Sequence, residues 1–68
     1  MNQYEIMLDY MKQNGSITGM ESYDIGVMNY KARISELRQM GYDIESVPET
    51  GINRYGRKIN YTRYVLHA

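Results

Sequence analysis

A group of cations lies near the carboxyl end of the chain, in the stretch NRYGRKINYTRY at residues 53–64. The stretch contains no acid and four cations: Arg54, Arg57, Lys58 and Arg63. The whole chain has eight Lys and Arg residues, so half of them fall in this stretch. Because arginine presents a planar fork of donors that suits phosphate, the pattern indicates binding of a polyanion.

A tyrosine and a glycine stand in the middle of the cationic stretch. Gly56 permits a tight turn and a close approach of the backbone to a ligand. Tyr55 is the tyrosine best placed for contact with nucleic acid, since aromatic rings stack on bases. We therefore expect a turn whose tip contacts phosphates or the minor groove. A loop kept soluble by its charge, or a platform for single strands, is the alternative.

The charge is unevenly distributed, although the chain is formally neutral. Residues 1–30 carry one cation and four acids, whereas residues 31–68 carry seven cations and four acids. A chain with this polarity can present a basic face to a polyanion. An ordinary solvated surface with uneven charge would give the same totals.

Other kinds of chemistry lack the residues that they need. The chain has no cysteine, which removes disulfides and thiolate metal sites and suits a reducing cytosol. His67 is the only histidine, and the acids are scattered. We therefore expect no enzyme, no metal, no cofactor and no small-molecule substrate.

The length of 68 residues predicts a single domain over residues 1–68. Its first residues already include acids, which is not the pattern of a signal peptide. No apolar run approaches the roughly 20 residues that span a bilayer. We expect a complete cytoplasmic protein that does not enter a membrane.

Apolar residues at helical spacing predict a first helix over about residues 3–14. Asn2 with Glu5 three residues later resembles a capping box at its start. Gly15 follows as a stop.

Two further helices are predicted, over about residues 19–25 and 28–40. Thr18 with Glu21 has the capping-box spacing for the shorter helix. That helix is expected to bury Met20, Tyr23 or Ile25, and Tyr10 and Tyr23 are expected in the core. In the longer helix, which Gly41 closes, the core face consists of Tyr30, Ile34 and Leu37.

Alternating residues then predict two antiparallel strands, over about residues 42–47 and 59–66. Pro48 is expected to end the first of them, with a loop or wide turn before the second. Ile17 is expected to be a single apolar anchor in a short extended piece. The order of elements predicts an α+β fold: a helix-turn-helix followed by a two-stranded hairpin wing.

The chain resembles two groups of winged helix-turn-helix proteins. The run ISELRQMGYDIESVPETG is similar to the biotin-repressor type of DNA-binding domain. The segments NGSIT, KARISELRQMGYDI and NRYGRKINYTRYVL resemble small phage and prophage helix-turn-helix proteins, and this resemblance covers roughly residues 5–66. This resemblance implies binding of duplex DNA, with the third helix in the major groove and the hairpin near the backbone. The opening VMNYKA of that helix departs from the usual family residues, so no base preference follows.

The third helix places small and polar residues opposite its core face. Asn29 can bond adenine through two contacts, and Lys31 can donate to guanine or phosphate. Arg33 borders the core face and could instead pair with Glu21 or Glu36. The candidate DNA-binding residues are Met28, Asn29, Lys31, Ala32, Arg33, Ser35, Arg54, Tyr55, Arg57, Lys58 and Arg63.

The expected partner is double-stranded DNA, bound by a phage or prophage transcriptional regulator or recombination accessory factor. A domain of this size covers a short site, so a homodimer or a partner protein would be needed for useful affinity. An edge of helix 1 formed by Met7, Leu8 and Met11 could supply a self-association surface. The alternative is a protein-interaction module of the same fold that binds a host protein.

Overall fold

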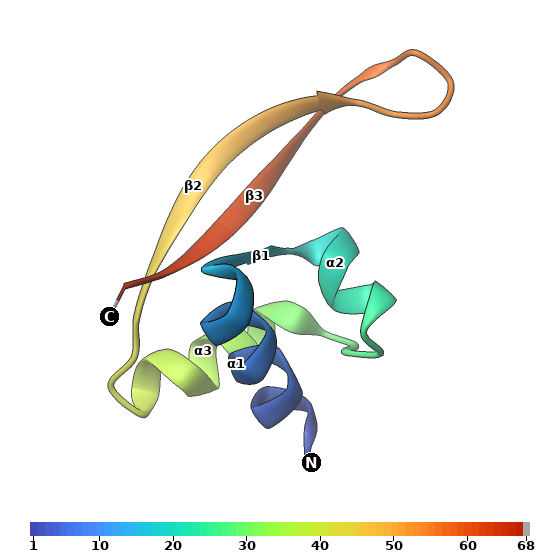
Figure 1. Cartoon of the computed structure of the whole chain (residues 1–68). Helices are drawn as coiled ribbons and strands as arrows, with labels where there is room; N and C mark the ends of the chain where they lie inside the picture. The colour runs from blue at the N-terminus through green and yellow to red at the C-terminus, as the bar shows by residue number, and fades with distance from the viewer. Residues whose placement is uncertain (68) are drawn as a thin grey trace.

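The computed structural model describes residues 1–67 and contains three helices and one three-stranded sheet (Figure 1). In order along the chain the elements are α1 (Gln3–Asn14), β1 (Ser16–Thr18), α2 (Gly19–Asp24), α3 (Tyr30–Gln39), β2 (Asp43–Ile52) and β3 (Lys58–His67). In Figure 1 the β2–β3 hairpin rises away from the helices, and its turn extends beyond α2. None of the helices in residues 1–67 has the length and apolar character of a membrane span.

The first two helices begin with the capping boxes that the sequence predicts. The Asn2 side chain accepts from the Glu5 N–H, and the Thr18 hydroxyl accepts from the Glu21 N–H. Each glutamate carboxylate in turn accepts from the backbone N–H of its capping residue. Gly15 ends α1 in the left-handed conformation with φ 85°, where a glycine has no steric penalty.

The sheet has three strands rather than the two of the predicted hairpin. The strand order is β1-β3-β2, and both pairs are antiparallel. The short extended piece around Ile17 is β1, and Ile17 lies opposite Tyr64 of β3. Because β1 leads directly into α2, this pairing attaches the start of α2 to the inner half of the hairpin.

The prediction that Pro48 ends a strand is wrong, because β2 continues to Ile52. Leu66 of β3 donates its N–H to the carbonyl of Gly15, on the β1 side. The backbone N–H and carbonyl groups of every second residue of β3 are directed to that same side. Thr62, which lies opposite Pro48, therefore directs its backbone away from β2. The missing N–H of proline thus falls on the free edge of β2, where it interrupts no ladder bond.

The third helix begins at Tyr30, two residues later than predicted. Asn29 immediately before it has φ 52° and ψ 53°, a left-handed conformation that an α-helix cannot include. Asparagine tolerates this conformation better than most residues, so the chain turns sharply into α3 at this position.

The core lies between the three helices and the inner half of the sheet. Its buried members are Met7, Met11, Ile17, Val27, Ile34, Leu37, Ile44 and Tyr64. Met7 and Met11 are completely buried, so the predicted self-association surface on α1 is wrong. Of the three residues of which one was expected to be buried by α2, Ile25 at its carboxyl end packs against the core. Met20 and Tyr23 are 70% and 51% exposed, so the expectation that Tyr23 lies in the core is wrong.

A close contact between α2 and α3 fixes the amino end of α3. A Cβ added to Gly19 would lie 2.7 Å from the ring of Tyr30, so any larger residue would force the ring to shift. The Tyr30 ring also lies edge-on to Tyr23 and 6.0 Å from the Tyr64 ring centroid. Tyr30 therefore ties the first turn of α3 both to α2 and to β3.

Candidate nucleic-acid interface

The turn between β2 and β3 is a short, ordered structure closed by one asparagine. The Asn53 side-chain oxygen accepts from the N–H groups of Tyr55 and Arg57, each at 3.0 Å. The Asn53 backbone donates to the Arg57 carbonyl and accepts from the Gly56 N–H. Gly56 has φ 77°, the conformation for which a glycine was expected. The wide loop of the prediction is therefore a turn over residues 53–57 at the end of two long strands.

Three of the four predicted cations, together with Tyr55, are exposed at this turn. Arg54, Arg57 and Lys58 are all exposed, and none of them forms an ion pair with another residue in the described range 1–67. Tyr55 is 82% exposed. We call residues 54–58 the cationic tip.

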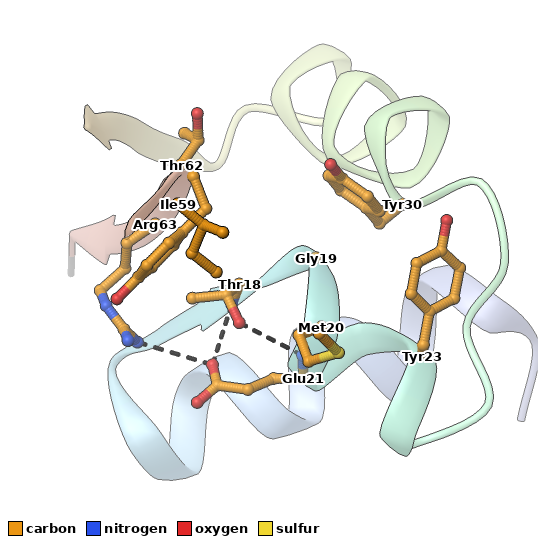
Figure 2. A pocket seen from close by; sticks show the side chains of 10 residues that line it. Thr18, Gly19, Met20, Glu21, Tyr23, Tyr30, Ile59, Thr62 and Arg63 are labelled. Carbon is orange, nitrogen blue, oxygen red and sulfur yellow. Dashed lines mark hydrogen bonds and ion pairs between the residues drawn. The ribbon is translucent and has the colours of Figure 1, made fainter. Parts of the chain in front are cut away.

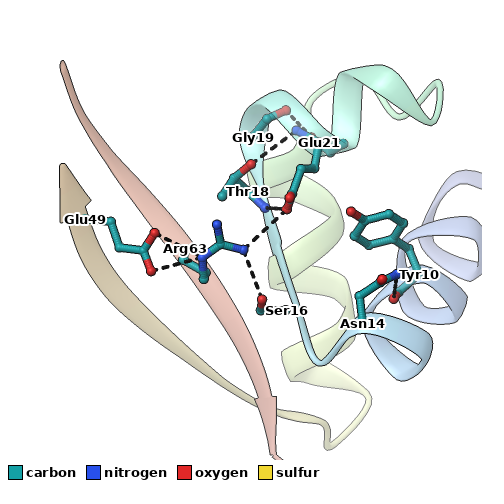
Figure 3. Close-up of polar contacts among 9 residues, drawn as sticks. Tyr10, Asn14, Ser16, Thr18, Gly19, Glu21, Glu49 and Arg63 are labelled. Atoms are coloured by element: carbon teal, nitrogen blue, oxygen red, sulfur yellow. Dashed lines mark hydrogen bonds and ion pairs between the residues drawn. The ribbon is translucent and has the colours of Figure 1, made fainter. Parts of the chain in front are cut away.

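The fourth cation, Arg63, has a different environment, which Figure 3 shows. Its guanidinium contacts Glu49 of β2 at 3.0 Å, Ser16 of β1 at 3.1 Å and Glu21 of α2 at 3.5 Å. The hydrogen bond from Arg63 lowers the pKa of the Glu49 carboxyl below its ordinary value. Arg63 therefore links three elements of the fold, and its charge is opposed by two carboxylates.

The amino end of α3 is open to solvent. Met28 is 57% exposed, and Asn29 and Lys31 are exposed as well. The Asn29 side chain makes no capping bond to α3, so its amide group remains available to a ligand. The first N–H groups of a helix also carry partial positive charge. These features together favour an acceptor-rich ligand at this end.

One side of α3 faces the hairpin. Arg38 donates to the carbonyl of Ile44 at 2.8 Å and to the Ser46 hydroxyl at 2.9 Å, both in β2. Lys31 and Ser35 lie seven and three residues before Arg38, so they share its side of the helix. Both are exposed, and Arg38 joins the carboxyl end of this stripe to β2.

The remaining candidates on α3 are less available. Arg33 forms an ion pair with Glu36 one turn later, which was one of the two partners expected for it. Both side chains are partly exposed, so the pair leaves some of the guanidinium accessible. Ala32 is partly buried.

The amino end of α3 lies below the outer half of the hairpin. Tyr30 lines the same hollow as Ile59 and Thr62 of β3 (Figure 2). The hairpin continues from Ile59 directly into Lys58 and the cationic tip. The hollow thus lies between the start of α3 and the part of β3 that leads into the cationic tip.

Sequence reasoning overlooked two residues that shape this surface. Asn53 closes the turn, and an Asx turn can be inferred from an asparagine two residues before an exposed tip. Arg38 lies in the last turn of α3, and its bonds to β2 depend on a strand register that no local pattern reveals.

Comparison with known proteins gives one match. A family model described as a winged helix-turn-helix domain matches residues 2–68. Searches of curated proteins and of solved structures found no match to the chain. Since the family model covers nearly every residue, the chain belongs to the winged helix-turn-helix domain family.

Proposed function

We propose that this protein binds double-stranded DNA, with the amino end of α3 in the major groove and the cationic tip against the backbone. The observation that carries the proposal is the set of exposed cations Arg54, Arg57 and Lys58 on an ordered turn, unopposed by any acid within residues 1–67. Such a tip can neutralise phosphates without first breaking an internal ion pair. Membership of the winged helix-turn-helix family supports the same reading.

The two contact regions have different tasks in this proposal. Asn29 and Lys31 reach base edges, because asparagine pairs with adenine and lysine donates to guanine. Met28 contacts a thymine methyl group, and Ser35 and Ala32 allow close approach of the helix. Arg54, Arg57 and Lys58 fix the position of the domain on the duplex without selecting a sequence. Arg33 contributes a phosphate contact beside Glu36, whereas Arg63 is left out because it holds the fold together.

The resemblance to small phage and prophage proteins extends the proposal. We assign the protein the role of a phage-type regulator of transcription or an accessory factor in recombination, acting where bacterial or phage DNA is found, in the cytoplasm. One domain of this size covers few base pairs, so a second copy or a partner protein supplies the remaining affinity. Similarity to the biotin-repressor type supports the same docking of α3.

Selection of bound duplexes from a random pool tests the proposal. The native protein should enrich a short shared sequence. Asn29→Ala should change the enriched bases, because the residue reads a base edge. Gln39→Ala, an exposed residue at the carboxyl end of the same helix, serves as the control. Recovery of a random pool by the native protein would refute sequence-specific binding. Equal losses on all sequences for Asn29→Ala would make Asn29 a backbone contact.

A further inference from the structure

A second surface lies along the β3 edge of the hairpin, on the side that faces away from β2. A hollow of ≈ 500 Å³ opens between α2, the amino end of α3 and the outer half of β3 (Figure 2). Its walls are mostly apolar and include Met20, Tyr23, Tyr30, Ile59 and Tyr61. Met20, Tyr23 and Ile59 remain 70%, 51% and 37% exposed, although the core is small. Exposed apolar groups gathered around one hollow indicate a binding surface.

The hollow adjoins a strand edge that lacks a partner strand. The pairing of β1 with β3 ends at Thr18 opposite Arg63, because the chain then enters α2. From Lys58 to Thr62, β3 is therefore paired with β2 alone within the described chain. An unpaired edge of this kind can accept an added strand.

The direction of the backbone groups on this edge follows from the ladder. Leu66 donates its N–H toward the β1 side, and alternate residues of an antiparallel strand point to the same side. Asn60 is therefore directed toward the open edge with both its N–H and its carbonyl. Its cross-strand neighbour Thr50 faces it without exchanging backbone bonds.

The charge of the surrounding helix determines what can bind. The sequence of α2, GMESYD, contains Glu21 and Asp24 and no cation. Glu21 is shared with Arg63, whereas Asp24 is exposed and forms no ion pair among residues 1–67. A ligand lying along α2 is therefore favoured if it is basic. Arg63 also lines the hollow, but two carboxylates oppose its charge. The open edge begins at Lys58 of the cationic tip, so the preference for basic residues applies to the part of the ligand that lies along α2.

We propose that the open edge of β3 and the hollow bind an extended segment of another protein. The segment adds to β3 as a strand beside Asn60, inserts one large apolar side chain into the hollow and places basic residues along α2. Backbone bonds supply affinity in this mode, and the inserted side chain supplies selectivity. The inference goes beyond DNA binding and gives the partner protein a defined contact surface.

A synthetic peptide provides the probe. The acetylated and amidated peptide Lys-Val-Lys-Phe-Lys-Val-Lys carries alternating side chains, an aromatic anchor and basic flanks. Titrated without DNA into ¹⁵N-labelled protein, it should cause saturable shifts in the amide signals of Asn60, Met20 and Tyr23. The same peptide with N-methyl groups on the amides of one edge should bind at least about tenfold more weakly, since it loses more than one hydrogen bond.

A protein variant tests the same contact from the other side. Asn60→Pro removes one outward N–H while leaving the β2 ladder intact, and it should weaken peptide binding about fivefold. Asn60→Ala keeps that N–H and should bind as the native protein does. An acidic peptide, Glu-Val-Glu-Phe-Glu-Val-Glu, should bind more weakly than the basic one.

Three outcomes would overturn the inference. These are equal binding of the N-methylated peptide, equal or tighter binding of the acidic peptide, and no saturable shift at the hollow up to millimolar peptide. The N-methylated peptide needs no altered protein, so the test stands even if Asn60→Pro does not fold. Because DNA is absent from every arm, none of these results bears on the proposed duplex contact.

Discussion

Removal of the cationic tip should change the salt dependence of DNA binding in a calculable way. In the variant Arg54→Ala/Arg57→Ala/Lys58→Ala, three exposed cations are lost, and no ion pair of the described fold is broken. Each phosphate contact contributes about 0.9 to the slope of log affinity against log salt. Three contacts therefore account for about 2.7 of that slope, or roughly a 40-fold fall in affinity between 50 and 200 mM salt.

The assay is fluorescence polarisation with a labelled duplex over a series of salt concentrations. The triple variant should bind all sequences more weakly at low salt and show the shallower slope. Arg57→Ala alone should lower the slope by about 0.9. Lys12→Ala, which removes one exposed cation from α1, is the matched control and should leave it unchanged. A triple variant with the native slope would refute the reasoning that the tip contacts phosphates.

Three further predictions concern the elements that hold this surface in place. Asn53→Ala removes the acceptor of the Tyr55 and Arg57 N–H groups, so both should exchange hydrogen faster and DNA affinity should fall. Exchange rates equal to those of the native protein would contradict the role of Asn53. Gly19→Ala should lower the melting temperature, because a Cβ 2.7 Å from the Tyr30 ring forces the ring to shift, at a cost of about 1–3 kcal/mol. An unchanged melting temperature would show that the ring moves freely. Glu49 has a lowered pKa, so its contribution to stability is present above its ordinary value of 4.5 and is lost as pH falls through the folded value. Thermal melts between pH 6 and pH 3 should therefore decline less for Glu49→Gln than for the native protein, and parallel declines would count against the Arg63 contact.

The helices could be predicted from the sequence because the patterns that indicate them involve residues close together in the chain. Capping boxes join residues three apart, so Asn2 with Glu5 and Thr18 with Glu21 could be identified without tertiary information. The later start of α3 was missed because the left-handed conformation of Asn29 has no clear local pattern. The helical elements of the fold were thus predictable to within about one turn.

The sheet was less accessible, since its pairings join distant residues. β1 has only three residues, and it pairs with a strand at the other end of the chain, where Ile17 lies opposite Tyr64, so no periodicity reveals it. Continuation of β2 through Pro48 depends on which way the proline nitrogen faces. The diagonal pairing of Arg63 with Glu49 could not be predicted either, because it depends on the register of β2 against β3.

In the candidate site, too, the features that depend on local sequence could be predicted, and those that depend on tertiary contacts could not. Exposed cations around Gly56 could be inferred from composition and turn chemistry alone. The sequence did not reveal that Asn53 orders this turn. It also did not reveal that two carboxylates pair with Arg63, because these contacts depend on the tertiary structure. The hollow beside β3 was also invisible, because its walls come from α2, α3 and β3.

In the proposed complex, the amino end of α3 and the cationic tip contact one duplex together. Titration of ¹⁵N-labelled protein with a duplex of about 16 base pairs tests it most directly, since each amide reports its own surroundings. Simultaneous shifts are expected in two groups of signals, residues 28–35 and residues 53–58, with one shared affinity. Shifts in only one group, or shifts confined to α1 and α2, would contradict it.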